Sequence, residues 1–184
     1  MNISKFTQKS VEILNNLEKI AYDFGAQEIA QEHLLYGMLT VEDSLIKKLI
    51  EKMEIDSDVF LAQVEGAVRK RPQVQGGQVY IGQDLNKVLV YAENEAKALG
   101  DEYVSVEHLF LSLLRKPSKE IKQLFHDFQI DRERFLQALS KVRGNQKVTT
   151  DNPEAVYDSL NKYGYDLVER AREKKLDPVI GRDE

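Results

Sequence analysis

The sequence contains no cysteine, which excludes disulfide bonds, thiolate nucleophiles and cysteine-ligated metal centres. This absence fits a reducing compartment, where disulfides give no advantage. No stretch approaches the roughly 20 apolar residues of a membrane span, and the start, MNISKFTQKS, lacks the apolar run of a signal peptide. Together these absences predict a cytoplasmic protein without a membrane partner.

Positive charges are also outnumbered by negative ones. Lys and Arg number 26 against 31 Asp and Glu, which gives a net charge of −5. The one basic cluster, RKR at Arg69–Arg71, suits the C-terminal turn of a helix, where cations interact favourably with the helix dipole. Binding to a nucleic-acid backbone requires more clustered cations than this, so we predict no nucleic-acid partner.

The chain repeats itself after 75 residues, because residues 6–68 align with residues 81–143 without a gap. The matching positions are mostly apolar, so the repetition indicates a duplicated structural unit rather than a duplicated site. Identical pairs include Leu14/Leu89, Ala21/Ala96, Gly25/Gly100, Glu32/Glu107, His33/His108, Leu39/Leu114, Ile46/Ile121, Leu49/Leu124, Ile55/Ile130, Asp56/Asp131 and Phe60/Phe135.

Each copy shows helical periodicity, and the alternation typical of strands is almost absent. Thr7 is the expected N-cap of a first helix that Gly25 ends, and Asp56 and Asp131 are the expected N-caps of the fourth helices. We therefore predict an all-α fold with two pseudo-symmetric four-helix repeats in one globular domain over residues 1–143. The apolar stripes of the first copy lie at residues 11–24, 34–39, 45–53 and from 60 onward.

The tripeptide Glu-His-Leu occurs at Glu32 and again at Glu107. A repeated catalytic site, a pair of metal ligands or a repeated helix start would each leave this trace. The chain lacks the His-Glu-x-x-His signature of helical zinc sites and the G-x-S-x-G motif that surrounds a nucleophilic serine. His126 is its only further histidine. A glutamate in the first turn interacts with the helix dipole, and a buried histidine satisfies backbone groups. We predict a structural role, with no catalytic residue and no metal site.

One loop carries the glycine spacing of a phosphate-binding loop, at Gly77 and Gly82. Gln83 and Asp84 stand where such a loop needs Lys and Ser or Thr to hold phosphate and magnesium. We therefore predict no nucleotide site here.

The composition changes after Arg143. The segment GNQKVTTDNPEA is polar, which predicts a flexible linker over residues 144–153. Residues 155–175 are expected to form a separate helix, whose apolar stripe has no third repeat to pack against. We interpret the chain as the front piece of a longer protein, whose next domain begins at residues 154–184.

Four stretches carry a family resemblance: the two EHL-type helix starts, RPQVQGGQVYIGQDLNKVL, and YGYDLVERAREKKLDPVIGRDE. The whole chain resembles the double N-terminal repeat of the Clp/Hsp100 ATPases, especially those of the ClpB type, followed by the entry to a first AAA+ module. In that family a Thr, Ser or Gly usually precedes Glu-His. Ser105 fits as a cap, whereas Ala30 has no capping side chain and should cost roughly 1 kcal/mol unless the backbone or Gln31 compensates. Gly82 stands where a serine cap is usual.

The resemblance implies a module that captures unfolded or aggregated polypeptides for threading by the AAA+ modules of a disaggregase. The alternative it allows is an adaptor-docking domain, as in ClpC-like unfoldases. It implies no enzymatic activity and no cofactor for this piece, which we expect to be monomeric. For the parent it implies a homohexameric ATPase of the stress response that uses ATP and magnesium and cooperates with an Hsp70-type chaperone.

The resemblance also implies site residues. The seam between the two copies is the expected binding groove, and each residue assigned to it has a competing structural role. The polar groove positions correspond to Thr7, Asp101 and Glu107, and our candidates for the apolar floor are Leu89 and Tyr91. Val179 and Ile180 correspond to adenine-pocket positions of the AAA+ module, which would bind nucleotide only in the full-length parent.

Overall fold

The computed structural model describes residues 5–74 and 76–159, in which helices predominate and the only strands are two of two residues each. The prediction of an all-α fold is confirmed. The first copy contains α1 (Gln8–Asn15), α2 (Leu17–Asp23), β1 (Glu28–Ile29), α3 (Gln31–Thr40), α4 (Leu45–Lys52) and α5 (Ser57–Arg69). The second copy contains β2 (Tyr80–Ile81), α6 (Gln83–Ala98), α7 (Val106–Arg115), α8 (Lys119–Asp127) and α9 (Arg132–Arg143), and α10 (Pro153–Ser159) follows it.

Three helices begin at the capping residues that the sequence predicts. The Thr7 hydroxyl accepts a hydrogen bond from the Ser10 amide, and the Asp131 carboxylate accepts one from the Arg134 amide. The Asp56 carboxylate accepts hydrogen bonds from the Asp58 and Val59 amides in the first turn of α5. Each cap satisfies amides that have no partner inside the helix, and is typically worth about 1 kcal/mol.

In each copy, the short segment before the first helix pairs with the other copy. Ile81, before the first helix of the second copy, pairs with Ile29 of the first copy in a parallel bridge. Phe6, which lies before α1, pairs in the same way with Val104 of the second copy. The next amide in each segment makes the equivalent hydrogen bond: Gly82 N–H donates to the carbonyl of Ile29, and Thr7 N–H donates to the carbonyl of Val104, both at 2.9 Å. The exchange therefore relates the copies by a pseudo-two-fold axis.

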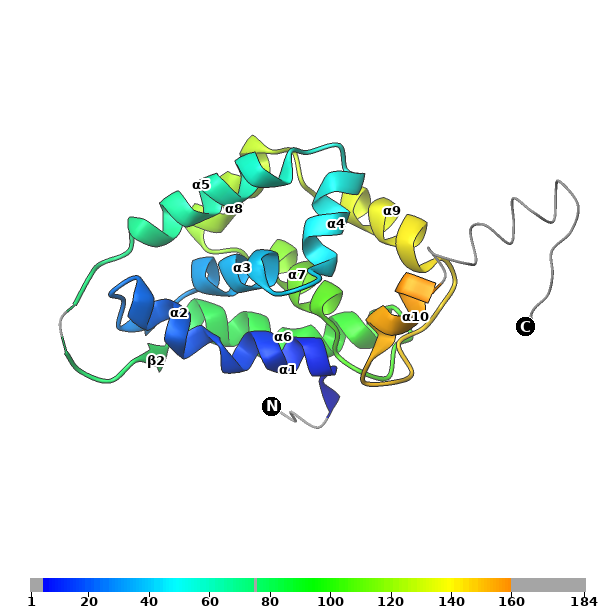
Figure 1. Ribbon diagram of the computed structural model, residues 1–184, viewed down its shortest axis with the longest axis horizontal. Helices are drawn as coiled ribbons and strands as arrows, with labels where there is room; N and C mark the ends of the chain where they lie inside the picture. Colours follow the sequence, from blue (N-terminus) through cyan, green and yellow to red (C-terminus); the bar gives the residue numbers. More distant parts are fainter. Residues whose placement is uncertain (1–4, 75, 160–184) are drawn as a thin grey trace, which may run out of the picture.

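The core lies around α3 and α7, which occupy the middle of the domain with α1 and α6 on one side and α5 and α8 on the other (Figure 1). Both central helices are buried around most of their circumference, which explains their nearly continuous apolar sequence. The outer helices pack across the copies in reciprocal pairs, α4 against α9 and α5 against α8. Phe60 and Phe128 meet edge to face across this boundary, with ring centroids 4.9 Å apart.

The first helix of each copy differs from the prediction in one respect. The second copy has one continuous helix, α6, whereas the first copy is divided at Asn16 into α1 and α2. Asparagine side chains compete with the backbone for hydrogen bonds and favour turns, and Asn15 and Asn16 stand together here. The expectation of one helix up to Phe24 is therefore wrong at this point.

Residues 144–152 contain no helix and contact both the second copy and the start of α1. The Glu102 amide donates to the carbonyl of Val148 at 2.8 Å, and the Gln8 amide donates to the carbonyl of Asp151 at 2.7 Å. Val148 is fully buried, whereas its neighbours on both sides are exposed. The mobility expected for residues 144–153 stays a prediction, and these contacts oppose it at Val148.

Candidate functional site

The repeated histidine caps its own helix in both copies. His33 Nδ1 accepts the Ala30 amide at 2.8 Å, and His108 Nδ1 accepts the Ser105 amide at 2.7 Å. A side chain at the third helical position that reaches back to the N-cap amide forms one half of a capping box. The structural role predicted for Glu-His-Leu is therefore confirmed at the histidine.

One detail of the predicted helix starts is wrong. Ser105 was expected to cap α7 with its side chain, but its buried hydroxyl has no hydrogen-bond partner among the described residues. His33 accepts the Ala30 amide just as His108 accepts the Ser105 amide, so it does not replace a side-chain cap at Ala30, and the cost of the missing cap stays a prediction. Gln31 does not cap α3 either. The Gln31 side chain donates to the carbonyls of Asp84 and Lys116 and accepts the Ser118 amide, so it joins the first copy to the second.

Asp101 and Glu107, two of the expected groove residues, lie together around Arg143. The guanidinium group donates to Asp101 at 2.5 Å and to Glu107 at 3.0 Å, and both carboxylates are fully buried. His108 Nε2 lies 2.6 Å from the other oxygen of Asp101. We call these four residues, with Tyr157, the buried ionic cluster.

The segment after α9 closes this cluster. The Val148 amide donates to Asp101 at 3.0 Å, and the Tyr157 hydroxyl donates to Glu107 at 3.2 Å. Burial alone would raise the pKa of Asp101, but the hydrogen bonds from His108 and Arg143 outweigh it and hold this pKa below its usual value. Burial and the charge of Glu107 raise the pKa of the Tyr157 phenol. Asp101 is therefore held in its ionised form and Tyr157 in its neutral form.

The first copy has only half of this arrangement. Ala26 occupies the position equivalent to Asp101, so His33 Nε2 is buried without a hydrogen-bond partner among the described residues. Burial and the nearby charge of Arg71 lower the pKa of His33 to about 4. Glu32 has Arg71 at 3.7 Å, and burial raises the pKa of this carboxyl. The ionic cluster is therefore a property of the second copy.

The five expected site residues fall into two groups. Thr7, Asp101, Glu107 and Leu89 have 8% or less of their surface exposed, whereas Tyr91 has 37% exposed. Thr7 acts as the cap of α1, and no hydrogen bond joins it to the ionic cluster. Leu89 lies on the inner face of α6 and belongs to the core, so as a groove floor it has no accessible surface in this structure.

Tyr91 is the expected residue that is open to solvent. It lies on the outer face of α6 beside Val90, which is also exposed. The Lys116 ammonium group sits over the Tyr91 ring, 4.8 Å from its centroid. Such a contact keeps the ring in place while its other face stays open.

Sequence reasoning missed Arg143 and Tyr157, which complete the ionic cluster. Arg143 corresponds to Val68 in the first copy, so the repeat gave no sign of it, and Tyr157 lies outside the repeats. Val179 and Ile180 lie outside the described residues.

Within residues 5–74 and 76–159, no group of three or more His, Asp or Glu side chains is placed to hold a metal ion. No helix in this part of the chain is long and apolar enough to cross a membrane. The carboxylates and histidine of the ionic cluster are closed off from solvent, so this geometry positions them for structure and leaves a substrate no access to them.

Comparison with known proteins identifies the family. The profile described as "Clp repeat (R) N-terminal domain" matches residues 5–128. The chain therefore belongs to the family of Clp N-terminal repeat domains, as its resemblance predicted. It is 45% identical over its whole length to the chaperone protein ClpB of Nitratidesulfovibrio vulgaris and 40% identical to that of Bacillus cereus. It spans only 22% of the length of either relative.

Solved structures agree on the fold. The N-terminal domain of Hsp104 from Candida albicans matches 80% of this chain and 97% of its own length, with a TM-score of 0.70 and 20% identity. A ClpV N-domain in complex with a VipB peptide matches 75% of this chain and 86% of its own, with a TM-score of 0.61 and 20% identity.

Proposed function

We propose that this chain is the substrate-binding module of a ClpB-like chaperone, which captures unfolded or aggregated polypeptides for threading by the AAA+ modules. The proposal draws on the membership of the Clp N-terminal repeat family and on relatives that are named as ClpB chaperones. The parent would supply ATP binding with magnesium, a homohexameric ring and cooperation with an Hsp70-type chaperone in the cytoplasm. Val179 and Ile180 would belong to its nucleotide pocket.

The observation that carries the proposal is the exposed apolar surface of α6. Val90 and Tyr91 have 52% and 37% of their surface exposed, although they lie on a helix whose other face is core. Unfolded chains share exposed apolar side chains, and a shallow surface with few fixed polar partners binds many of them weakly. A disordered ligand also loses entropy when it binds, so dissociation constants of roughly micromolar or weaker are expected.

In this proposal the buried residues act indirectly. Thr7 fixes the start of α1. Asp101 holds the segment after α9 through the Val148 amide, and Glu107 holds it through the Tyr157 hydroxyl. They would contact substrate directly only if that segment moved away.

The alternative is an adaptor-docking domain that recognises one folded or linear partner. It is favoured by the structural relative that was solved with a VipB peptide, because that N-domain binds a defined peptide. A docking domain would bind a single partner tightly and ignore unrelated unfolded chains, whereas a capture module would bind many chains weakly.

Fluorescence anisotropy with a permanently unfolded protein, such as reduced and carboxymethylated lactalbumin, tests the proposal. Tyr91→Asp places a charge on the apolar surface and should weaken binding several-fold without changing the melting temperature. Tyr22→Asp is the matched control, because Tyr22 is 73% exposed on the first copy and should leave binding unchanged. No binding by the native chain would reject capture, and equal binding by both variants would move the site away from α6.

A further inference from the structure

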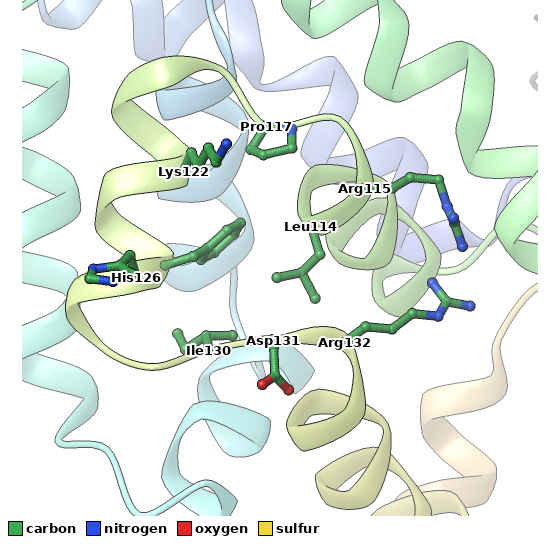
Figure 2. A pocket seen from close by; sticks show the side chains of 9 residues that line it. Leu114, Arg115, Pro117, Lys122, His126, Ile130, Asp131 and Arg132 are labelled. Atoms are coloured by element: carbon green, nitrogen blue, oxygen red, sulfur yellow. The ribbon is translucent and has the colours of Figure 1, made fainter.

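A pocket of about 470 Å³ opens between α7, α8 and α9 of the second copy (Figure 2). Its volume lies in the range of pockets that hold a small ligand or one or two side chains. We call it the α7–α9 pocket. It is lined by Leu114, Arg115, Pro117, Lys122, Phe125, His126, Ile130, Asp131 and Arg132.

The floor of the α7–α9 pocket is apolar. Leu114 and Ile130 point into the space between the helices in Figure 2. Phe125 adds an aromatic ring that is almost wholly buried. This floor suits an aliphatic or aromatic side chain from a partner.

The rim of the pocket is cationic. Arg115 and Arg132 both bind the buried carboxylate of Glu95, so two guanidinium groups share one negative charge. Burial would raise the pKa of Glu95, but these hydrogen bonds outweigh it and hold the pKa below its usual value. The bonds use only one nitrogen of each arginine, and Lys122 has no ion pair among the described residues. The rim therefore keeps N–H donors and net positive charge for a ligand.

The repeat indicates that the fold does not require these charges. The positions 75 residues earlier hold Ile20 for Glu95, Thr40 for Arg115 and Ser57 for Arg132. The first copy thus builds the same helix packing without the ionic triad. Only Glu95 of this triad is buried, because the Arg115 and Arg132 side chains are 49% and 34% exposed. Ion pairs with partly exposed partners typically add little stability, so stability alone does not account for the triad in the second copy.

We propose that the α7–α9 pocket binds polypeptide segments in which an apolar side chain is flanked by acidic residues. The apolar side chain would enter between Leu114 and Ile130, and the carboxylates would meet Arg115, Arg132 and Lys122. This inference deepens the proposed function, on which it rests, by giving the second copy a preferred class of segment. Asp131 also lines the pocket and keeps its negative charge, but Arg115, Arg132 and Lys122 together outnumber the two carboxylates of Asp131 and Glu95.

Fluorescein-labelled 12-residue peptides test this. The first has a central Leu-Phe pair flanked by glutamates, the second has lysines in place of the glutamates, and the third has serines in place of Leu-Phe. We expect the first peptide to bind at least about tenfold more tightly than either of the others, and its affinity to fall as salt rises. Equal binding of the acidic and basic peptides would overturn the inference.

Charge reversal within the chain supplies the second arm. Lys122→Glu should weaken the acidic peptide roughly three- to tenfold, as expected when an exposed attractive pair becomes repulsive. Lys47→Glu is the matched control at the equivalent position of the first copy and should change the affinity by less than about twofold. Equal losses in both variants would show a general charge effect and reject the pocket.

The two proposals fail differently. If unfolded lactalbumin binds but the acidic peptide has no advantage, the α7–α9 pocket is rejected and capture stands. If neither binds, both are rejected.

Discussion

Replacement of Arg143 by leucine should destabilise the domain more than any surface change on α9. The guanidinium group is 5% exposed and bridges two fully buried carboxylates, those of Asp101 and Glu107. Leucine leaves both carboxylates buried without their cation. Removing one partner of a buried ion pair typically costs about 3–5 kcal/mol. For a chain of this size, each kcal/mol lowers the melting temperature by roughly 2–4 °C, so we expect a drop of about 6–20 °C.

Circular dichroism at neutral pH measures this drop. Lys141→Leu is the control, because Lys141 is exposed on the same helix and should change the melting temperature by no more than about 2 °C. Tyr157→Phe, which removes one hydrogen bond to Glu107, gives a milder step of about 1 kcal/mol that tests the cluster even if Arg143→Leu does not fold.

The pH dependence provides a further check. The pKa of Asp101 is held below its usual value in the native chain, so the stabilisation is present above that usual value and is lost as pH falls through the lowered one. The difference in melting temperature between the native chain and Arg143→Leu should therefore become smaller below about pH 4. A drop under about 2 °C at neutral pH would refute the buried ionic cluster.

Three more predictions follow from single contacts. Burial lowers the pKa of His33 to about 4 from an ordinary 6.5, so the unfolded chain binds a proton before the folded chain does. In urea unfolding, the free energy of unfolding should therefore fall by about 3 kcal/mol as the pH is lowered from 6.5 to 4, and His33→Gln should remove this loss. Gly82→Ser should gain no cap energy, since its Cβ would lie 2.2 Å from Glu28 Oε2 and 2.9 Å from Glu28 Cγ. In a chain that already carries Glu28→Ala, and so lacks the Glu28–Arg71 ion pair, Gly82→Ser should add about 1 kcal/mol to the free energy of unfolding in urea. In hydrogen exchange, the Val148 amide should be as slow as those of α9 and the Thr149 amide fast; a fast Val148 would instead support a mobile linker.

Much of the fold was predictable because the sequence contains two copies of the same helical pattern. The ungapped offset of 75 residues predicts equivalent helices, and Thr7, Asp56 and Asp131 cap them through local contacts that need no tertiary information. The exchange of Phe6 and Ile81 between copies was not predictable, since two-residue bridges depend on how the copies meet.

The site was less predictable for a physical reason. Helical periodicity shows that Leu89 lies on an apolar face, but it does not show what covers that face. The environment of Asp101 depends on Arg143, 42 residues later, and on Tyr157 beyond the repeats. Such long-range pairing breaks the symmetry between the copies, which is why Asp101 and Ala26 at equivalent positions have different surroundings.

The central claim is that this chain binds polypeptides through the second copy. Hydrogen exchange of the native chain, with and without saturating unfolded lactalbumin, tests it most directly. The account predicts slower exchange around Tyr91 on α6 and around Lys116 and Lys122, with the helices of the first copy unchanged. Protection confined to α1–α5, or no protection at all under saturating conditions, would contradict it.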